Sequence, residues 1–231
     1  MSSVLQDEPL PFLAHFEQRT SLLARLRPPI IQGYVFLQIL AVTGSVLAMF
    51  FRRRWSHILS PLLLGLSATP LAFLVAGAIP VKEEWSAVVV LLLISVLMTG
   101  LFLSVGRLRS LALVSGFTFV LLAGDVLSGS NLIKSSIFGY DLSAGARYYG
   151  IGNEYMGVFI GSGIFLGGLI LEEFKLKREW WLPVLAATTA ITLFPFWGAN
   201  VGGGITAIAG LASFLLCGKE VRRIWPYMLG L

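Results

Sequence analysis

Long apolar blocks separated by short polar connections extend through most of the chain. The blocks at 30–51, 58–79, 85–106, 110–127, 148–171, 180–197 and 202–217 each predict a helix, and another apolar stretch begins at Ile224. A helix needs about 20 predominantly apolar residues to cross the hydrocarbon core of a bilayer, and most of these blocks approach that length. The pattern therefore predicts an all-α, polytopic transmembrane helix bundle with about seven to eight spans.

Composition agrees with a chain embedded in lipid. Of the 231 residues, 56% are hydrophobic and only 13% are charged, whereas about 25% are charged in an ordinary soluble domain. The formal net charge is +5, but the basic residues form short clusters between apolar blocks. They do not form a stripe with interleaved aromatic residues, so the charge does not favour a nucleic-acid partner.

The cations are divided unequally between the two sides of the predicted bundle. Apart from the N-terminal segment, eleven lie in loops on one side and three in loops on the other. The larger group is Arg52, Arg53, Arg54, Arg107, Arg109, Lys175, Lys177, Arg178, Lys219, Arg222 and Arg223, and the smaller is Lys82, Lys134 and Arg147. Because cytoplasmic loops carry an excess of Lys and Arg, Arg52–Arg54 is predicted to be cytoplasmic and the N-terminus external.

Residues 1–29 are polar or amphipathic and lack the pattern of a signal peptide. Pro28-Pro29 is predicted to separate this extracytoplasmic tail from a transmembrane domain over 30–231. An external tail has to be translocated, and the apolar stretch from Ile224 stops at Leu231. These features favour a piece of a longer protein, truncated at its C-terminus, and simple translocation of the tail is the alternative.

Polar residues gather on the predicted external side. Asp125 ends the fourth block, Asp141 and Arg147 lie in the next connection, and Asn153 and Glu154 begin the fifth block. Ionisable groups at this depth cost free energy and commonly face a partner charge or a water-filled cavity. One interpretation is an external pocket in which Arg147 binds an anion and Asp125, Asp141 or Glu154 acts as acid, base or counter-ion.

Two other interpretations of this external region stay open. The charged groups fit a position at headgroup level, with Tyr148, Tyr149 and Tyr155 as an aromatic belt. The same residues also fit an interface with another protein domain.

The fifth block carries a glycine stripe on one predicted helix face. Its members recur at intervals of seven, four and seven residues: Gly150, Gly157, Gly161 and Gly168. Small residues at such spacing let helix backbones approach closely in lipid, so the stripe predicts helix packing. A face kept open for a lipid tail is the functional alternative, and Gly163 with Gly167 forms a second, shorter pair on a neighbouring face.

The connection over 195–204 is also predicted to be external. Pro195 ends one helix, Asn200 supplies a polar side chain, and Gly202–Gly204 leaves the backbone free. A plain tight turn is favoured for the triple glycine over a phosphate-binding nest, because no Lys or Ser follows in the register of a P-loop. The pattern leaves open whether the connection is re-entrant.

Metal-ligating and catalytic patterns are scarce. Cys217 is the only cysteine, and His15 and His57 are predicted to lie on opposite sides of the membrane. These residues predict no metal site and no cofactor. The sequence also lacks HExxH, GxSxG and Walker patterns, so it assigns no reaction.

The segment Gly145–Gly157, which reads GARYYGIGNEYMG, resembles a signature of bacterial multi-spanning membrane proteins. In longer members, the membrane part resembles a C-terminal module that follows an extracytoplasmic domain similar to the alkaline phosphatase superfamily. The resemblance implies a bacterial cytoplasmic membrane location, and it implies that residues 1–29 end such a domain. The domain itself is outside this sequence, so its metal site and phosphatase chemistry are not carried over.

These observations lead to two hypotheses from different classes. The first is a membrane module that binds or presents an envelope precursor, such as a lipid-linked or phosphorylated glycan, at the outer leaflet. Its candidate binding residues are Asp125, Asp141, Arg147, Asn153, Glu154 and Asn200. The alternative is a structural anchor or partner-docking module without chemistry of its own, and a transporter is disfavoured because the span centres carry almost no charge.

Overall fold

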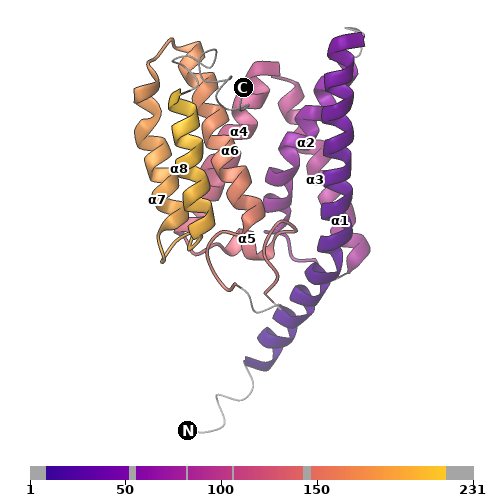
Figure 1. The fold of residues 1–231 in the computed structure, drawn as a ribbon. Helices are drawn as coiled ribbons and strands as arrows, with labels where there is room; N and C mark the ends of the chain where they lie inside the picture. Colours follow the sequence, from indigo (N-terminus) through magenta and orange to yellow (C-terminus); the bar gives the residue numbers. More distant parts are fainter. Residues whose placement is uncertain (1–8, 52–55, 82, 106, 143–146, 217–231) are drawn as a thin grey trace, which may run out of the picture. The chain divides into compact units, whose positions relative to one another are not determined.

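The computed structural model describes residues 9–51, 56–81, 83–105, 107–142 and 147–216, and the regular structure in these ranges is helical (Figure 1). Eight α-helices and one 3-10 helix lie in the described ranges. They are α1 Pro9–Phe51, α2 Ser56–Ala76, α3 Glu84–Leu103, α4 Arg107–Leu127, α5 Asn131–Ser135, α6 Asn153–Glu173, η2 Arg178–Trp181, α7 Leu182–Leu193 and α8 Val201–Leu216. The prediction of an all-α fold is confirmed.

Four of these helices are long and apolar enough to cross a membrane. The qualifying stretches are Glu17–Leu47 in α1, Glu84–Leu103 in α3, Arg109–Leu127 in α4 and Asn153–Glu173 in α6. Pro61–Ala76 in α2 and Val201–Phe214 in α8 are shorter apolar helices. Length and composition therefore indicate a multi-pass membrane protein with four candidate spans.

Several helices begin or end at other residues than predicted, because the local backbone conformation is not helical there. The fifth block was expected over 148–171, but α6 begins at Asn153 because Gly150 has a φ of 83° and Gly152 is extended. The sixth was expected over 180–197, but α7 ends at Leu193. Phe194 is extended with a ψ of 131°, as is usual for a residue that precedes proline.

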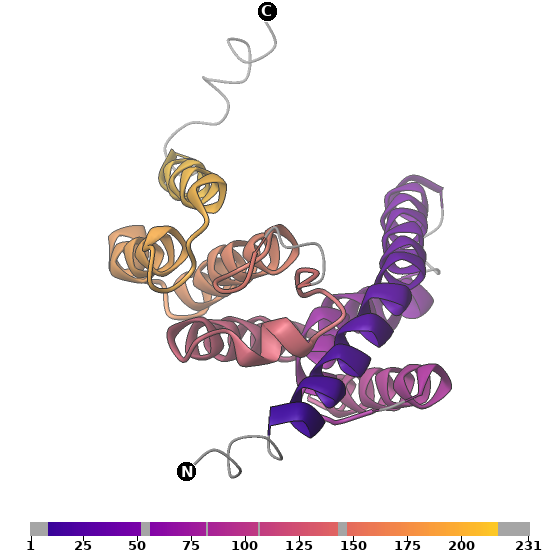
Figure 2. The ribbon, with the colours of Figure 1, turned by 90° about the horizontal axis from the view of Figure 1, so that it is seen from below.

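The chain divides into two compact units. Unit 1 contains Met1–Val114 and Ser130–Tyr148, and unit 2 contains Ser115–Gly129 and Tyr149–Leu231. In unit 1, α2 contacts both α1 and α3, and the short helix α5 contacts α2. In unit 2, α6, α7 and α8 contact one another, and Figure 2 shows these three helices end-on.

An aromatic cluster joins α1, α2 and the segment after α5 inside unit 1. The ring of Phe138 meets the rings of Tyr34 and Phe73 edge-on, with centroid separations of 5.2 and 5.1 Å. The Tyr34 hydroxyl also donates a 3.0 Å hydrogen bond to the carbonyl of Leu66 in α2. Aromatic packing and a satisfied hydroxyl therefore fix α1 against α2.

Helix α1 continues through Pro28 and Pro29, so the predicted boundary between the tail and the first span is not a helix end. Figure 1 shows the helix changing direction along its length, as expected where two prolines remove backbone donors. On the N-terminal side of the prolines, Leu22, Leu23 and Leu26 are buried. The tail is therefore part of a packed amphipathic helix where the structure describes it.

Arg27 ties this helix to the segment that follows α4. Its side chain is 6% exposed, and Nη2 donates to the carbonyls of Lys134 and Ser136 at 3.4 and 3.2 Å. The Ser136 hydroxyl in turn donates to the carbonyl of Phe73 at 3.0 Å. A cation suits this position because helix α5 ends there and its last carbonyls carry partial negative charge.

We predict that Arg27→Gln lowers the free energy of unfolding by about 2–3 kcal/mol, because it removes charge-assisted hydrogen bonds to buried carbonyls. The matched control is Arg25→Gln, since the Arg25 side chain is 76% exposed and pairs with Glu84 only at 3.8 Å. That exposed pair should contribute less than about 0.5 kcal/mol. Unfolding in detergent micelles measures both, and equal effects of the two substitutions would contradict the assignment.

In unit 2, one row of α6 side chains forms the buried face of the helix. The row repeats every fourth residue and consists of Tyr155, Phe159, Gly163, Gly167 and Leu171. The ring of Phe119 from α4 stacks on Phe159 at a centroid distance of 4.9 Å and lies over Gly163. The indole of Trp181 lies against Gly167 and donates a 3.0 Å hydrogen bond to the carbonyl of Gly163.

The close packing of α6 therefore falls on Gly163 and Gly167, and the predicted stripe does not provide it. A Cβ at Gly157, Gly161 or Gly168 would meet no heavy atom within 4 Å among the described residues. The reason is the helical period of 3.6 residues, which places the two sets of glycines on different faces. Gly150 also makes a close contact, but it lies before the helix begins.

Candidate functional site

The connection between α7 and α8 folds back on the last turn of α7. The amide of Gly198 donates to the carbonyl of Ile191 at 2.9 Å, and the amide of Asn200 donates to that of Thr192 at 3.0 Å. The amides of Trp197 and Ala199 both donate to the carbonyl of Phe194, each at 3.1 Å. The end of α7 therefore has partners for its last carbonyls within the connection itself.

Two glycines allow the segment before α6 to cross this connection at close range. Gly150 adopts a φ of 83°, and a Cβ there would collide with the carbonyl oxygen of Gly198. A Cβ at Gly198 would itself collide with the carbonyl of Thr192. The amide of Ile151 donates to the Gly198 carbonyl at 2.9 Å, so the two segments meet through backbone atoms. A larger residue at either position would separate them.

Asn200 joins these segments and begins α8. Its side chain is buried, with 5% exposed. Nδ2 donates to the carbonyl of Ile151 at 3.0 Å and to Oδ1 of Asn153 at 3.2 Å. Oδ1 accepts a 2.8 Å hydrogen bond from the amide of Gly203. Asn200 is therefore the N-cap of α8 and also a cross-link to the start of α6.

Gly202–Gly204 forms the first turn of α8, so the prediction of a plain tight turn at these residues is wrong. A Cβ at Gly203 would lie 2.6 Å from side-chain atoms of Met156 and of Thr192. A Cβ at Gly204 would lie 2.6 Å from the side chain of Leu193. The glycines are thus required because α8 packs closely on α6 and α7 at this point. A phosphate nest is also disfavoured, because the amide of Gly203 already bonds Asn200.

The structure brings the predicted site residues Asn153 and Asn200 into direct contact through a hydrogen bond. Glu154, in the first turn of α6, is exposed. Asp125, in the last turn of α4, is only 5% exposed, which contradicts a fully solvated position at headgroup level. Asp141 and Arg147 are half-buried and belong to unit 1, whereas the other four residues belong to unit 2.

The helix ends give this part of unit 2 a partial positive charge. The N-termini of α6 and α8 both begin beside Asn200, and a helix N-terminus carries about half an elementary charge. Glu154 offsets the charge at α6, but the first turn of α8 has no acidic residue. The first turn of α8 therefore carries no negative side chain, and its Gly203 amide is already bound by Asn200.

An exposed aromatic group lies in the same connection. The ring of Phe194 is 5.7 Å from that of Phe196 and 4.9 Å from that of Trp197. Phe196 is 83% exposed and Phe194 is 46% exposed. Rings of this kind suit the boundary between headgroups and hydrocarbon, and their flat apolar faces also suit amphipathic ligands.

Two features of the site have no clear signal in the sequence. The carbonyl of Ile151 is a backbone acceptor, and only the tertiary contact shows that Asn200 binds it. Arg27 in unit 1 was likewise assigned to the polar tail, and only its tertiary contacts show that it is buried. Within the described ranges, no group of three or more His, Cys, Asp or Glu residues could hold a metal ion.

Comparisons of the chain with protein-family models, with curated proteins and with solved structures find no match. The geometry of the described residues is therefore the basis for the functional proposals below.

We predict that Asn200→Ala lowers the free energy of unfolding by about 3 kcal/mol, because it removes the cap of α8 and leaves the Ile151 carbonyl buried without its amide donor. The amide of Gly203 should then exchange with deuterium faster, and hydrogen-exchange mass spectrometry measures this. Asn131→Ala is the matched control, because Asn131 is an exposed asparagine at the start of α5. Unchanged exchange at Gly203 in the Asn200 variant would contradict the capping role.

Proposed function

We propose that the chain is a membrane module of seven to eight spans, with its N-terminus outside, that binds or presents an envelope precursor at the outer leaflet. The precursor class is an amphipathic anion, such as a lipid-linked or phosphorylated glycan. The observation that supports this proposal is the hydrogen-bonded contact of Asn200 with Ile151 and Asn153. This contact joins the N-termini of α6 and α8 at one polar end of unit 2.

The proposed topology rests on helix lengths together with the distribution of cations. Helix α6 has 21 residues and a length of about 31 Å, which matches a hydrocarbon core of about 30 Å. Helices α7 and α8 have 12 and 16 residues, and so lengths of about 18 and 24 Å. No charged residue occurs between Glu179 and Lys219. We therefore propose that α7 and α8 form an apolar hairpin that enters from the cytoplasmic side, with its connection directed toward the external side.

We predict that a thiol at position 128 is accessible from outside intact cells and that a thiol at position 177 is not. Ser128→Cys and Lys177→Cys are made separately in a Cys217→Ser background, because Cys217 is the only natural cysteine. Both positions are exposed, so burial does not bias the comparison. A membrane-impermeant maleimide should label the first variant in whole cells and the second only after lysis. The reverse result would contradict the orientation.

The external end of unit 2 has the groups that an amphipathic anion requires. The first turn of α8 lacks an acidic residue, so no carboxylate there repels an anionic group. Exposed Phe194 and Phe196 provide apolar contacts next to it, and exposed Glu154 provides an acid, a base or a counter-ion. Arg147 belongs to unit 1 and is proposed on its own to bind an anionic group, because a guanidinium binds phosphate through two parallel hydrogen bonds.

We predict that Arg147→Ala weakens the binding of a polyprenyl phosphate about tenfold, which corresponds to the loss of one charge-assisted hydrogen-bonded contact. Native mass spectrometry of the protein in lipid nanodiscs measures the affinity, and polyprenyl diphosphate with an attached glycan is the second probe. Glu154→Gln should weaken the binding of the second probe, because a carboxylate is a stronger acceptor than an amide for hydrogen bonds from glycan hydroxyls.

The control for this prediction is Glu172→Gln, an exposed acid at the other end of α6. It should leave the binding of both probes unchanged. If Arg147→Ala and Glu154→Gln both bind the probes as the unmodified chain does, the proposed precursor site is wrong.

A structural anchor or docking module is the second candidate, and the exposed glycines of α6 favour it. Gly157, Gly161 and Gly168 face open space in the described structure, as expected for a surface that receives a helix of another protein. This candidate and the first differ in their tolerance to substitution. An anchor loses its partner when the stripe is filled, whereas a precursor site depends on Arg147 and Glu154.

A further inference from the structure

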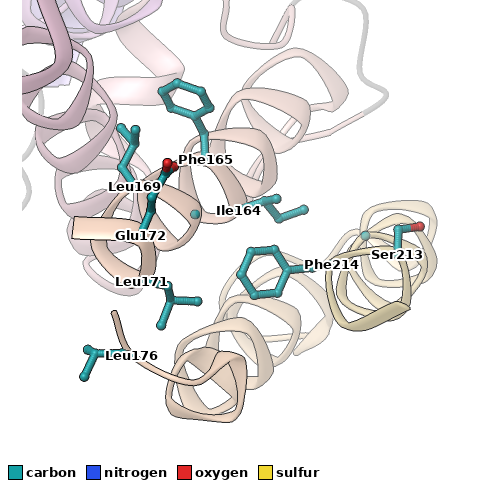
Figure 3. A pocket seen from close by; sticks show the side chains of 10 residues that line it. Ile164, Phe165, Leu169, Leu171, Glu172, Leu176, Ser213 and Phe214 are labelled. Carbon is teal, nitrogen blue, oxygen red and sulfur yellow. The ribbon is translucent and has the colours of Figure 1, made fainter. Parts of the chain in front are cut away.

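An open groove of about 760 Å³ lies between the C-terminal parts of α6 and α8 in unit 2 (Figure 3). Its walls are apolar over most of their length and include Ile164, Leu169, Leu171, Leu176 and Phe214. Figure 3 shows the rings and aliphatic side chains of both helices around this space, with the carboxylate of Glu172 among them. The size is within the range of about 300–1,000 Å³ that is usual for ligand sites.

Two glycines shape the groove, because Gly210 receives the side chain of Ile164 and Gly168 leaves a side-chain position empty. Ile164 approaches Gly210 closely, since a Cβ at Gly210 would lie 2.8 Å from the Ile164 side chain. Past this contact, a Cβ at Gly168 would meet no heavy atom within 4 Å among the described residues, and Gly168 lines the groove. From Ile164 to Glu172 the groove follows α6 for about 12 Å, which suits an extended acyl chain.

Charges of both signs lie at one end of this apolar groove. Glu172 contributes to the lining, and the lining residue Leu176 has an exposed lysine on either side of it in sequence, Lys175 and Lys177. A purely anionic headgroup would be repelled by the Glu172 carboxylate at close range. A headgroup with both a phosphate and an ammonium group would complement the lysines and the carboxylate together.

We propose that this groove binds a zwitterionic phospholipid whose headgroup carries a phosphate and a primary ammonium. The acyl chain lies along Gly168 and Phe214, the ammonium pairs with Glu172, and the phosphate binds Lys175 or Lys177. The lipid belongs to the inner leaflet, because these lysines are part of the basic cluster assigned to the cytoplasm. The inference depends on the proposed orientation but not on the precursor site, which lies at the other end of α6.

The test uses the full chain in nanodiscs that contain a phosphoethanolamine lipid with a photoreactive diazirine in its acyl chain. Irradiation and mass spectrometry should place labels on Leu169, Leu171 and Phe214. Gly168→Leu fills the groove and should lower this labelling about tenfold, and Ser213→Leu on the opposite wall should act in the same direction. Labelling of Leu92 and Leu97, which are exposed apolar residues of α3, should stay constant because they contact bulk lipid.

Two control variants and one test of the headgroup decide the outcome. Gly161→Leu adds the same side chain at an open position of α6 outside the groove and should leave the groove labels unchanged. Glu172→Gln should lower the preference for a phosphoethanolamine over a phosphoglycerol probe about fivefold, as expected for one interfacial charge. Glu154→Gln should have no effect, which separates this test from that of the precursor site.

The proposal is overturned by any of three results. Groove labels that persist in Gly168→Leu would mean that the surface contacts only bulk lipid. An absence of labels from the groove while α3 is labelled would mean that residues 217–231, a second copy of the chain or another protein covers it. An unchanged headgroup preference in Glu172→Gln would refute the zwitterionic headgroup.

Discussion

The hydrogen bonds of Asn200 are the contacts on which the ordered end of unit 2 depends. In a bilayer, backbone amides and carbonyls need partners within the protein, because no water is present in the core to replace them. Asn200 satisfies the amide of Gly203, the carbonyl of Ile151 and the side chain of Asn153. These bonds give the non-helical segments before α6 and α8 partners for several of their polar groups, as a position close to the hydrocarbon requires.

In unit 1, a buried cation is the hydrogen-bond donor for backbone carbonyls of a connecting segment. There, Arg27 from α1 binds the carbonyl of Lys134 in the short helix α5 and the carbonyl of Ser136 directly after it. Both units thus use one buried polar side chain, distant in sequence, to hold a connection between longer helices. An arginine side chain reaches further than an asparagine, but its charge costs more free energy to bury. The partial negative charge at the C-terminus of a helix offsets part of that cost.

Hydrophobic periodicity and length predict the helical class and the approximate helix positions, because both depend on local sequence. The ends of α6 and α7 were less predictable, since they depend on the positive φ of Gly150 and on the extended residue before Pro195. The roles of the glycines could not be predicted from spacing alone. Gly157 and Gly163 are both glycines of α6, and only the position of the Phe119 ring shows that Gly163 is the one in close contact.

The candidate site shows the same division between local and tertiary information. Polarity and position in the sequence were sufficient to select Asn153 and Asn200, but not to reveal that Asn200 caps α8 and binds a backbone carbonyl. Those bonds depend on a fold-back of the connection that no local pattern encodes. Sequence thus indicates which polar groups are unusual for a membrane segment, and the tertiary contacts decide what each group does.

The buried groups of α6 and α7 in unit 2 are mostly apolar or hydrogen-bonded within their own helix. The buried row of α6 from Tyr155 to Leu171 contains no ionisable side chain other than the phenol of Tyr155 itself. In α7, the hydroxyls of Thr188 and Thr192 donate to carbonyls of their own helix. The acidic side chains of α6 lie instead at its two ends, with Glu154 in the first turn and Glu172 near the last residue. This placement supports the proposed sites at the two ends of α6, because ionisable groups are least costly near the ends of an apolar helix.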